Sequence, residues 1–105
     1  MSSTFRVEHD FLGEKEIPAE AYWGVHTARA VENFPISGTP ISAMPELIRA
    51  FGHVKKATAR ANLQLGALDE KRAHAIMFAC DLLIAGRYHE QFVVDVIQGL
   101  SLIHI

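Results

Sequence analysis

The sequence predicts a mainly α-helical (α+β) fold in which a small N-terminal β-hairpin precedes an antiparallel helical hairpin. The hairpin is indicated by the alternation of side chains over residues 5–10. The helices are indicated by apolar residues spaced three and four apart over residues 45–66 and 69–85. The chain has 105 residues, half of them apolar, which is enough for one small domain.

The first expected element is a strand over residues 5–10. Its two faces alternate, with Phe5, Val7 and His9 on one side and Arg6, Glu8 and Asp10 on the other. A turn over residues 12–15 leads to a short return strand over residues 16–18, which has to lie at an edge or end at Pro18 because proline donates no ladder hydrogen bond. A short helix over about 27–33 and a loop over 35–40 should follow.

The first long helix should begin at Pro45, since proline at the first helical position costs no hydrogen bond. Gly66 is placed to end it. Its expected buried stripe recurs at helical spacing and consists of Leu47, Phe51, Val54, Thr58, Ala61 and Leu65.

The second long helix should begin after Asp69, whose carboxylate can cap it, and end at Gly86. Its expected buried face consists of Ala73, Ile76, Met77, Cys80, Leu83 and Ile84. Because the link between the two helices is short, they should pack antiparallel. Residues 87–99 should be irregular or form a short strand over 92–97.

Composition excludes several classes of function. The formal net charge is −2 and no basic stripe is present, so we expect no nucleic-acid partner. The longest apolar stretch, residues 73–85, is too short to span a bilayer, and no N-terminal signal is visible, so we expect no membrane partner and a cytoplasmic protein. The single cysteine, Cys80, lies in an apolar helical stretch, which favours a buried inert thiol.

The residues alone carry few candidate sites. The six histidines do not pair at helical spacing, so we expect no metal. Tyr88-His89-Glu90 is a triplet capable of acid–base chemistry, but a solvated turn after Gly86 is the favoured interpretation. A basic cluster on the first long helix could bind an anion or form a solvated face; it comprises Arg49, Lys55, Lys56 and Arg60.

A longer pattern covers nearly the whole chain. It includes residues 6–13, the segment 22–36, residues 54–57 and the run Asp95-Val96-Ile97-Gln98-Gly99. In this order and spacing the pieces resemble the N-terminal domain of the aspartase/fumarase superfamily of lyases. Within it, Gly24-Val25-His26-Thr27 is similar to the aspartate ammonia-lyases, whereas class II fumarases usually carry Gly-Ala-Gln-Thr there.

The resemblance implies an anti elimination that converts L-aspartate reversibly to fumarate and ammonia, without a cofactor, in a homotetramer. It also implies that the donors for the substrate carboxylate follow Gln98 in a glycine-rich loop, and that the catalytic residues lie beyond Gly99. No catalytic residue is therefore expected within this chain. By itself the chain should be inactive and should not form the tetramer.

Three residues of the best-matched segment, His26, Thr27 and Arg29, could lie near the substrate or an activator in the whole enzyme. The alternative is that they pin the N-terminal hairpin to the helices by hydrogen bonds. The sequence favours this second interpretation and leaves the first open.

Residues 1–99 should form the incomplete lyase N-terminal domain, and residues 100–105 a tail foreign to the family. The family has a second glycine where Leu100 stands, because backbone amides must approach the substrate closely. Leu-Ser-Leu-Ile-His-Ile is what the end of a common transposase sequencing adapter encodes (CTG TCT CTT ATA CAC ATC), so we interpret this tail as an artefact. The alternative is a natural apolar C-terminus packed on the helices.

Two other functions remain alternatives to an aspartate ammonia-lyase part. One is the same region of a class II fumarase, which shares the fold and mechanism but eliminates water. The other is a non-catalytic helical module that docks a partner through an exposed helix face.

Overall fold

The computed structural model describes residues 4–98. They form two compact units, the first made of the chain up to Ile41 together with the segment from Glu90 onward, and the second of Ser42–His89. Gly99 and the proposed foreign tail lie outside the described residues. The described chain is mainly helical with one two-stranded sheet, as predicted.

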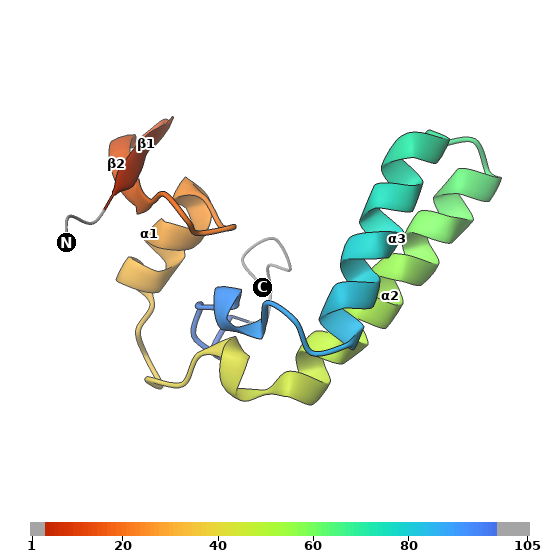
Figure 1. Ribbon diagram of the computed structural model, residues 1–105. Helices are drawn as coiled ribbons and strands as arrows, with labels where there is room; N and C mark the ends of the chain where they lie inside the picture. The colour runs from red at the N-terminus through yellow and green to blue at the C-terminus, as the bar shows by residue number, and fades with distance from the viewer. Residues whose placement is uncertain (1–3, 99–105) are drawn as a thin grey trace. The chain divides into compact units, whose positions relative to one another are not determined.

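The first unit begins with an antiparallel β-hairpin of β1 (Phe5–Asp10) and β2 (Gly13–Pro18) (Figure 1). The pairing runs from Phe5 opposite Pro18 to Asp10 opposite Gly13. Gly13 has a φ of 116°, which the tight turn requires and which a residue with a Cβ rarely adopts. The first strand is confirmed, and the return strand starts three residues earlier than the sequence indicated.

The covered face of the hairpin is its charged face. Arg6, Glu8 and Asp10 are half-buried, whereas Phe5 and Val7 are 52% and 62% exposed. Ile17, which lies opposite Arg6 and on the same face, is fully buried. Helix α1 (Val25–Asn33) packs on this hairpin and contributes Val25 and Ala28 to the same small core.

Helix α1 begins two residues before the predicted start because a distant side chain caps it. Oε1 of Glu8 accepts a hydrogen bond of 2.9 Å from the backbone N–H of Val25. A Cβ on Gly24 would lie 2.7 Å from this oxygen, so only glycine leaves room for the cap at that position.

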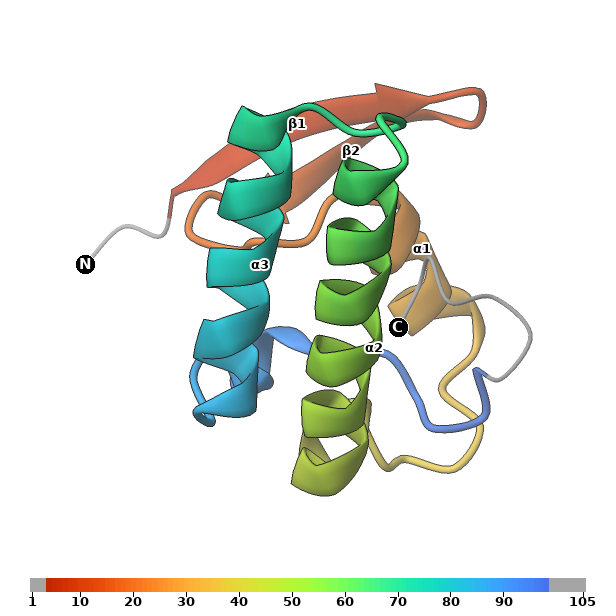
Figure 2. The same ribbon diagram turned by 90° about the vertical axis from the view of Figure 1, so that its right-hand side faces the viewer.

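The second unit is an antiparallel helical hairpin of α2 (Pro45–Gln64) and α3 (Glu70–Ile84), which lie side by side in Figures 1 and 2. The predicted limits are confirmed: Asp69 accepts a hydrogen bond of 3.0 Å from the N–H of Arg72. Gly66 and Gly86, just past the two helix ends, have φ values of 76° and 93°, typical of C-terminal caps.

The predicted buried stripes are in part wrong. On α2 the buried residues are Ile48, Gly52 and Ala59, while Val54 and Leu65 are 59% and 81% exposed. On α3 the expected Ala73 and Cys80 are buried, but Ile76 is 40% exposed. Leu47, Phe51, Met77, Leu83 and Ile84 are half-buried, and Thr58 and Ala61 are exposed.

The buried face of α2 differs from the predicted one because α2 and α3 approach each other closely at Gly52. A Cβ there would lie 2.9 Å from Cγ1 of Ile84 and 3.2 Å from the carbonyl oxygen of Cys80. The helices therefore approach closely at Gly52, where α2 has no side chain, rather than along the predicted positions Val54, Thr58, Ala61 and Leu65, which are exposed. Spacing alone does not reveal which of two neighbouring stripes contains such a contact.

The segment after α3 forms no strand within the described residues. A single turn of 3₁₀-helix, His89–Gln91, is followed by an isolated bridge between Asp95 and Pro40 in the first unit. Val94 and Ile41 flank this bridge and are each 1% exposed. No helix in residues 4–98 combines the length and apolar character needed to cross a membrane.

Candidate functional site

Two of the three candidate residues on α1 meet at a carboxylate of β1. Arg29 donates to Asp10 from Nε at 2.8 Å and from its terminal nitrogen at 2.9 Å, and also to the carbonyl of Gly13 at 3.1 Å. Nδ1 of His26 lies 3.9 Å from the same carboxylate. The hydrogen bonds from Arg29 lower the pKa of Asp10 below its ordinary value, which keeps the carboxylate charged.

The side chains of His26, Thr27 and Arg29 differ in how far they are exposed to solvent. Arg29 is mostly covered, with 22% of its side chain exposed, and Thr27 is half-buried. The imidazole of His26 is 69% exposed at the edge of the Asp10–Arg29 pair. The structure thus joins His26 and Arg29 through Asp10, with Arg29 tying α1 to the hairpin and His26 open to solvent.

A second charged pair, Arg6 and Glu8, fixes the segment that leads into α1. Nε of Arg6 donates to Glu8 at 2.7 Å, which lowers the pKa of that carboxyl group. The remaining guanidinium nitrogens donate at 2.6–3.1 Å to the backbone carbonyls of Pro18, Ala19, Ala21 and Trp23. A planar cation with several fixed donors suits this task, which lysine cannot reproduce.

Asp95 is the most highly coordinated carboxylate of the described chain, and the sequence analysis did not single it out. Its Oδ2 accepts from the N–H groups of Ser37 (2.8 Å) and Gly38 (3.0 Å). Its Oδ1 accepts from Oγ of Ser37 (2.7 Å) and from the N–H of Ile97 (2.9 Å). These hydrogen bonds, led by that of Ile97, lower the pKa of Asp95 to about 2 although only 7% of the residue is exposed.

Backbone hydrogen bonds join the same two segments. The N–H of Ile41 donates to the carbonyl of Val94 (2.8 Å), and that of Val96 to the carbonyl of Thr39 (2.9 Å). We call residues 37–41 and 94–98, with the Asp95 carboxylate between them, the Asp95 clamp. The signal available in the sequence was a lone acidic residue inside the apolar run 92–97.

The Tyr88-His89-Glu90 triplet has a local structural role at the end of α3. Nε2 of His89 lies 2.8 Å from the carbonyl oxygen of Leu83, one of the last carbonyls of that helix. The contact requires the proton on Nε2, which donates to the helix end. Tyr88, two residues after Gly86, has a φ of 63°, a left-handed conformation that non-glycine residues adopt uncommonly.

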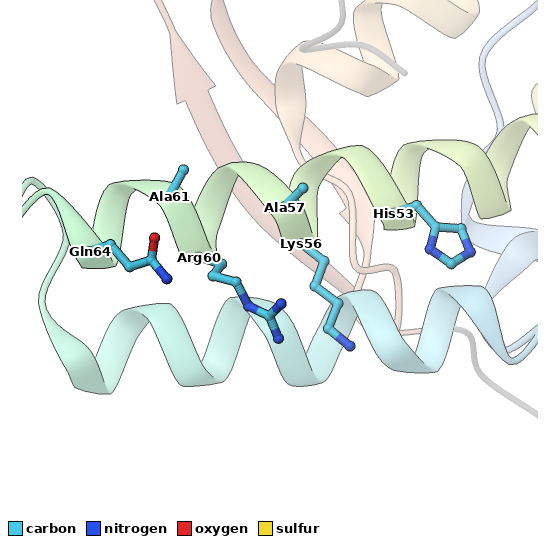
Figure 3. A pocket seen from close by; sticks show the side chains of 6 residues that line it. All are labelled: His53, Lys56, Ala57, Arg60, Ala61 and Gln64. Carbon is cyan, nitrogen blue, oxygen red and sulfur yellow. The ribbon is translucent and has the colours of Figure 1, made fainter.

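Two of the four basic residues of α2 are paired separately with different carboxylates. Lys56 bonds Asp81 on α3 at 2.6 Å, and Arg49 bonds Glu46 at 2.6 Å. A shallow depression on this helix is lined by the side chains of Figure 3, namely His53, Lys56, Ala57, Arg60, Ala61 and Gln64. This arrangement matches the alternative of a solvated helix face.

Two remaining candidates concern metal and thiol chemistry. Within residues 4–98, no three His, Cys, Asp or Glu side chains gather where they could hold a metal ion. Cys80 is buried and unpaired, and burial raises the pKa of its thiol. The predicted burial of this thiol is confirmed, and its raised pKa favours the protonated, less reactive form near neutral pH.

Comparison with known proteins shows which proteins share this sequence and architecture. A family model described as lyase matches residues 13–103. An aspartate ammonia-lyase of Helicobacter pylori is 54% identical over 94 residues, which are 90% of this chain and 20% of that protein. The class II fumarate hydratase of Halobacterium salinarum is also 54% identical, over 98 residues, 93% of this chain and 20% of that protein.

Solved structures agree with the sequence matches. A fumarate lyase:delta crystallin of Brucella melitensis superimposes with a TM-score of 0.85 at 50% identity, over 93% of this chain and 21% of that one. The class II fumarase of Schistosoma mansoni gives a TM-score of 0.77 at 28% identity, over 87% of this chain and 19% of that one.

The hairpin, the short helix and the antiparallel helix pair are thus the N-terminal domain of the aspartase/fumarase fold. The chain belongs to the lyase family of that superfamily. It spans about a fifth of the length of the curated relatives it matches.

Proposed function

We propose that the chain is the N-terminal part of an aspartate ammonia-lyase, which reversibly eliminates ammonia from L-aspartate to give fumarate. Aspartate ammonia-lyases from Helicobacter pylori, a Bacillus species and Escherichia coli match at 51–54% identity over 90–94% of the chain. The whole enzyme would be a cytoplasmic homotetramer working without a cofactor. Residues 1–99 would be its N-terminal domain.

The observation that carries the choice of reaction is the exposed His26. Overall identity gives no preference, because a class II fumarate hydratase is as similar as the aspartate ammonia-lyases. Of the two positions that separate the classes, Val25 is 6% exposed, so packing alone could account for it. The imidazole of His26 is 69% exposed and fills no core, so its presence favours a role in binding.

The chemistry divides between this chain and the rest of the enzyme. Removal of the proton beside the β-carboxylate puts a second negative charge on that carboxylate, which preorganised donors must stabilise. We propose that the loop after Gln98 and later segments supply these donors and the base. The described residues would support the site, with His26, Thr27 and Arg29 near the substrate or an activator.

The experiment uses the complete gene product that continues beyond residue 98. Purified enzyme incubated with L-aspartate should raise the ultraviolet absorbance of fumarate, and L-malate should give no comparable rise. Turnover of malate instead would favour the class II fumarase alternative. Turnover of neither substrate would overturn the enzyme hypothesis and leave the helical interaction module.

The tail has its own test. We propose that residues 100–105 derive from a sequencing adapter, and the codons of the underlying DNA decide this. Codons synonymous with, but different from, the adapter sequence would contradict the proposal.

A further inference from the structure

We infer that an uncovered apolar stripe on α2 is the docking surface for a helix of the chain that continues beyond residue 98 in the complete protein. The stripe consists of the residues of α2 that the sequence predicts to be buried, namely Leu47, Phe51, Val54, Thr58, Ala61 and Leu65. We call these six residues the α2 stripe. The inference rests on membership of the family and applies to either of the two reactions considered above.

The α2 stripe is exposed although most of its residues are apolar. Val54 and Leu65 are 59% and 81% exposed. The two residues between them on the stripe are also exposed, and the two nearest the start of α2 are half-buried. A contiguous apolar patch on a folded chain marks a surface at which another element binds.

Helix α3 does not cover the α2 stripe, because it contacts another side of α2. The close contact with α3 is at Gly52, and the buried residues of α2 are Ile48, Gly52 and Ala59. At about 100° per residue, these three residues lie about 120° around the helix from the α2 stripe. A helix at the surface of a domain typically has one apolar side, whereas α2 has two. One of these sides is covered by α3, and the other needs a second partner.

The spacing of the α2 stripe indicates that this second partner is a helix. Its residues recur at intervals of four, three, four, three and four, which is the pattern along which two helices pack in a coiled coil. The stripe extends over residues 47–65, about 27 Å of helix. Thr58 and Ala61 are small, and small side chains at the contact let the axes of two helices approach closely.

The partner helix is supplied by the same polypeptide. The residues aligned with the aspartate ammonia-lyase of Helicobacter pylori are 20% of that protein, so about four fifths of it has no counterpart here. Where separate chains pair as coiled coils, charges on both flanks usually select the partner. One flank of the α2 stripe has no charge and consists of Ala50, Ala57 and Gln64, and the other carries only Lys55. A stripe without charged flanks favours a contact inside one folded chain.

The test is thiol labelling of the complete enzyme at single introduced cysteines, with N-ethylmaleimide as the probe and peptide mass spectrometry as the readout. In folded Val54→Cys the introduced thiol should react about 10²-fold more slowly than in the same variant unfolded in urea, because a covered site reacts only when the structure opens. His53→Cys is the matched control. His53 is exposed on the same helix but lines the depression of Figure 3, outside the α2 stripe, so its thiol should react at close to the unfolded rate.

Equal protection at the two positions would overturn the inference, whether both thiols react fast or both react slowly, because the α2 stripe would not be singled out. The alternative occupant is α2 of a second copy. Val54 lies near the middle of the stripe, so two α2 helices paired along their stripes would bring the introduced thiols together, and oxidation would give a covalent dimer on a non-reducing gel. That dimer would also overturn the inference, whereas slow labelling without it supports the inference.

A second variant covers the case in which Val54→Cys does not fold. Thr58→Cys places a thiol at the next position of the α2 stripe, and the hydroxyl that it removes donates to the carbonyl of Val54 in the same helix at 2.8 Å. It should show similar protection, and free reaction in a folded Thr58→Cys enzyme would contradict the inference. Labelling requires no turnover, so absence of lyase activity would overturn the proposed function alone.

Discussion

At the residue scale, Asp95 gives the chain a pH dependence whose sign is set by its low pKa. The pKa of about 2 lies below the ordinary value of 3.8, so the folded state favours the charged form. The stabilisation is complete above pH 3.8 and is lost as the pH falls toward 2. Protonation places an O–H among four donors, much as Asp95→Asn places an NH₂ there.

We therefore predict that the stability difference between the wild type and Asp95→Asn depends on pH. Urea unfolding followed by circular dichroism should give a large difference in midpoint at pH 7 that narrows progressively below pH 4. The comparison cancels the titration of the other carboxyl groups, which both proteins share. A difference that is equal at pH 7 and pH 2.5 would contradict the hydrogen-bond account of Asp95.

His26 carries a second prediction at this scale. In the complete enzyme, His26→Gln should raise KM for L-aspartate, or the concentration of activator needed, by about tenfold, as for one lost hydrogen bond to a charged group. His74→Gln is the matched control, because His74 is similarly exposed and its Nε2 lies 3.5 Å from Glu70 of its own helix. Equal kinetics in both variants would assign His26 to surface packing around Asp10.

At the element scale, the contact of α2 with α3 depends on Gly52. Alanine is the better helix former by about 1 kcal/mol, but its Cβ would meet Ile84 at 2.9 Å and the Cys80 carbonyl at 3.2 Å. Overpacking costs about 1–3 kcal/mol, so Gly52→Ala should lower the free energy of unfolding by about 1 kcal/mol. Urea denaturation measures this change.

His53→Ala provides the control for that measurement. Its side chain is exposed on the same helix, one residue further along, so removing it should leave the free energy of unfolding within about 0.5 kcal/mol of the wild type. If Gly52→Ala proved more stable than the wild type, the helices would not be in the close contact described.

The helix limits were predictable from sequence because their signals are local. Pro45, Asp69, Gly66 and Gly86 act within a turn of their own positions, and the structure confirms each of them. Which face of α2 is buried was not predictable, since it depends on which residue of α3 opposes Gly52. Periodicity gives the existence of an apolar stripe and not the identity of its partner.

The candidate site was likewise predictable from the sequence only in part. The α1 segment was recognisable because its residues are contiguous, and the structure joins His26 and Arg29 at Asp10. The role of Asp95 was not recognisable in the sequence, because the N–H groups that donate to it, at residues 37 and 38, come from a distant part of the chain. A carboxylate bound by backbone N–H groups leaves almost no pattern in side-chain types.

At the scale of the whole molecule, we predict that the 105-residue chain has no lyase activity by itself. The proposed base and carboxylate donors come from other parts of the enzyme, and the loss of one such donor typically lowers the rate by about 10²–10³. Purified chain incubated with L-aspartate should show no fumarate absorbance above a buffer control. Turnover that follows the chain through purification would place a site within residues 1–98.

The discontinuity of the first unit has a consequence for synthesis on the ribosome. The helical pair is made entirely of nearby contacts and can form as soon as it has emerged. The Asp95 clamp cannot, because Ser37 has to wait for a partner 58 residues later. At roughly 5–20 residues per second, translation of that interval takes about 3–12 s. During this time the loop around Ser37 lacks its carboxylate, so the helical pair assembles before the Asp95 clamp.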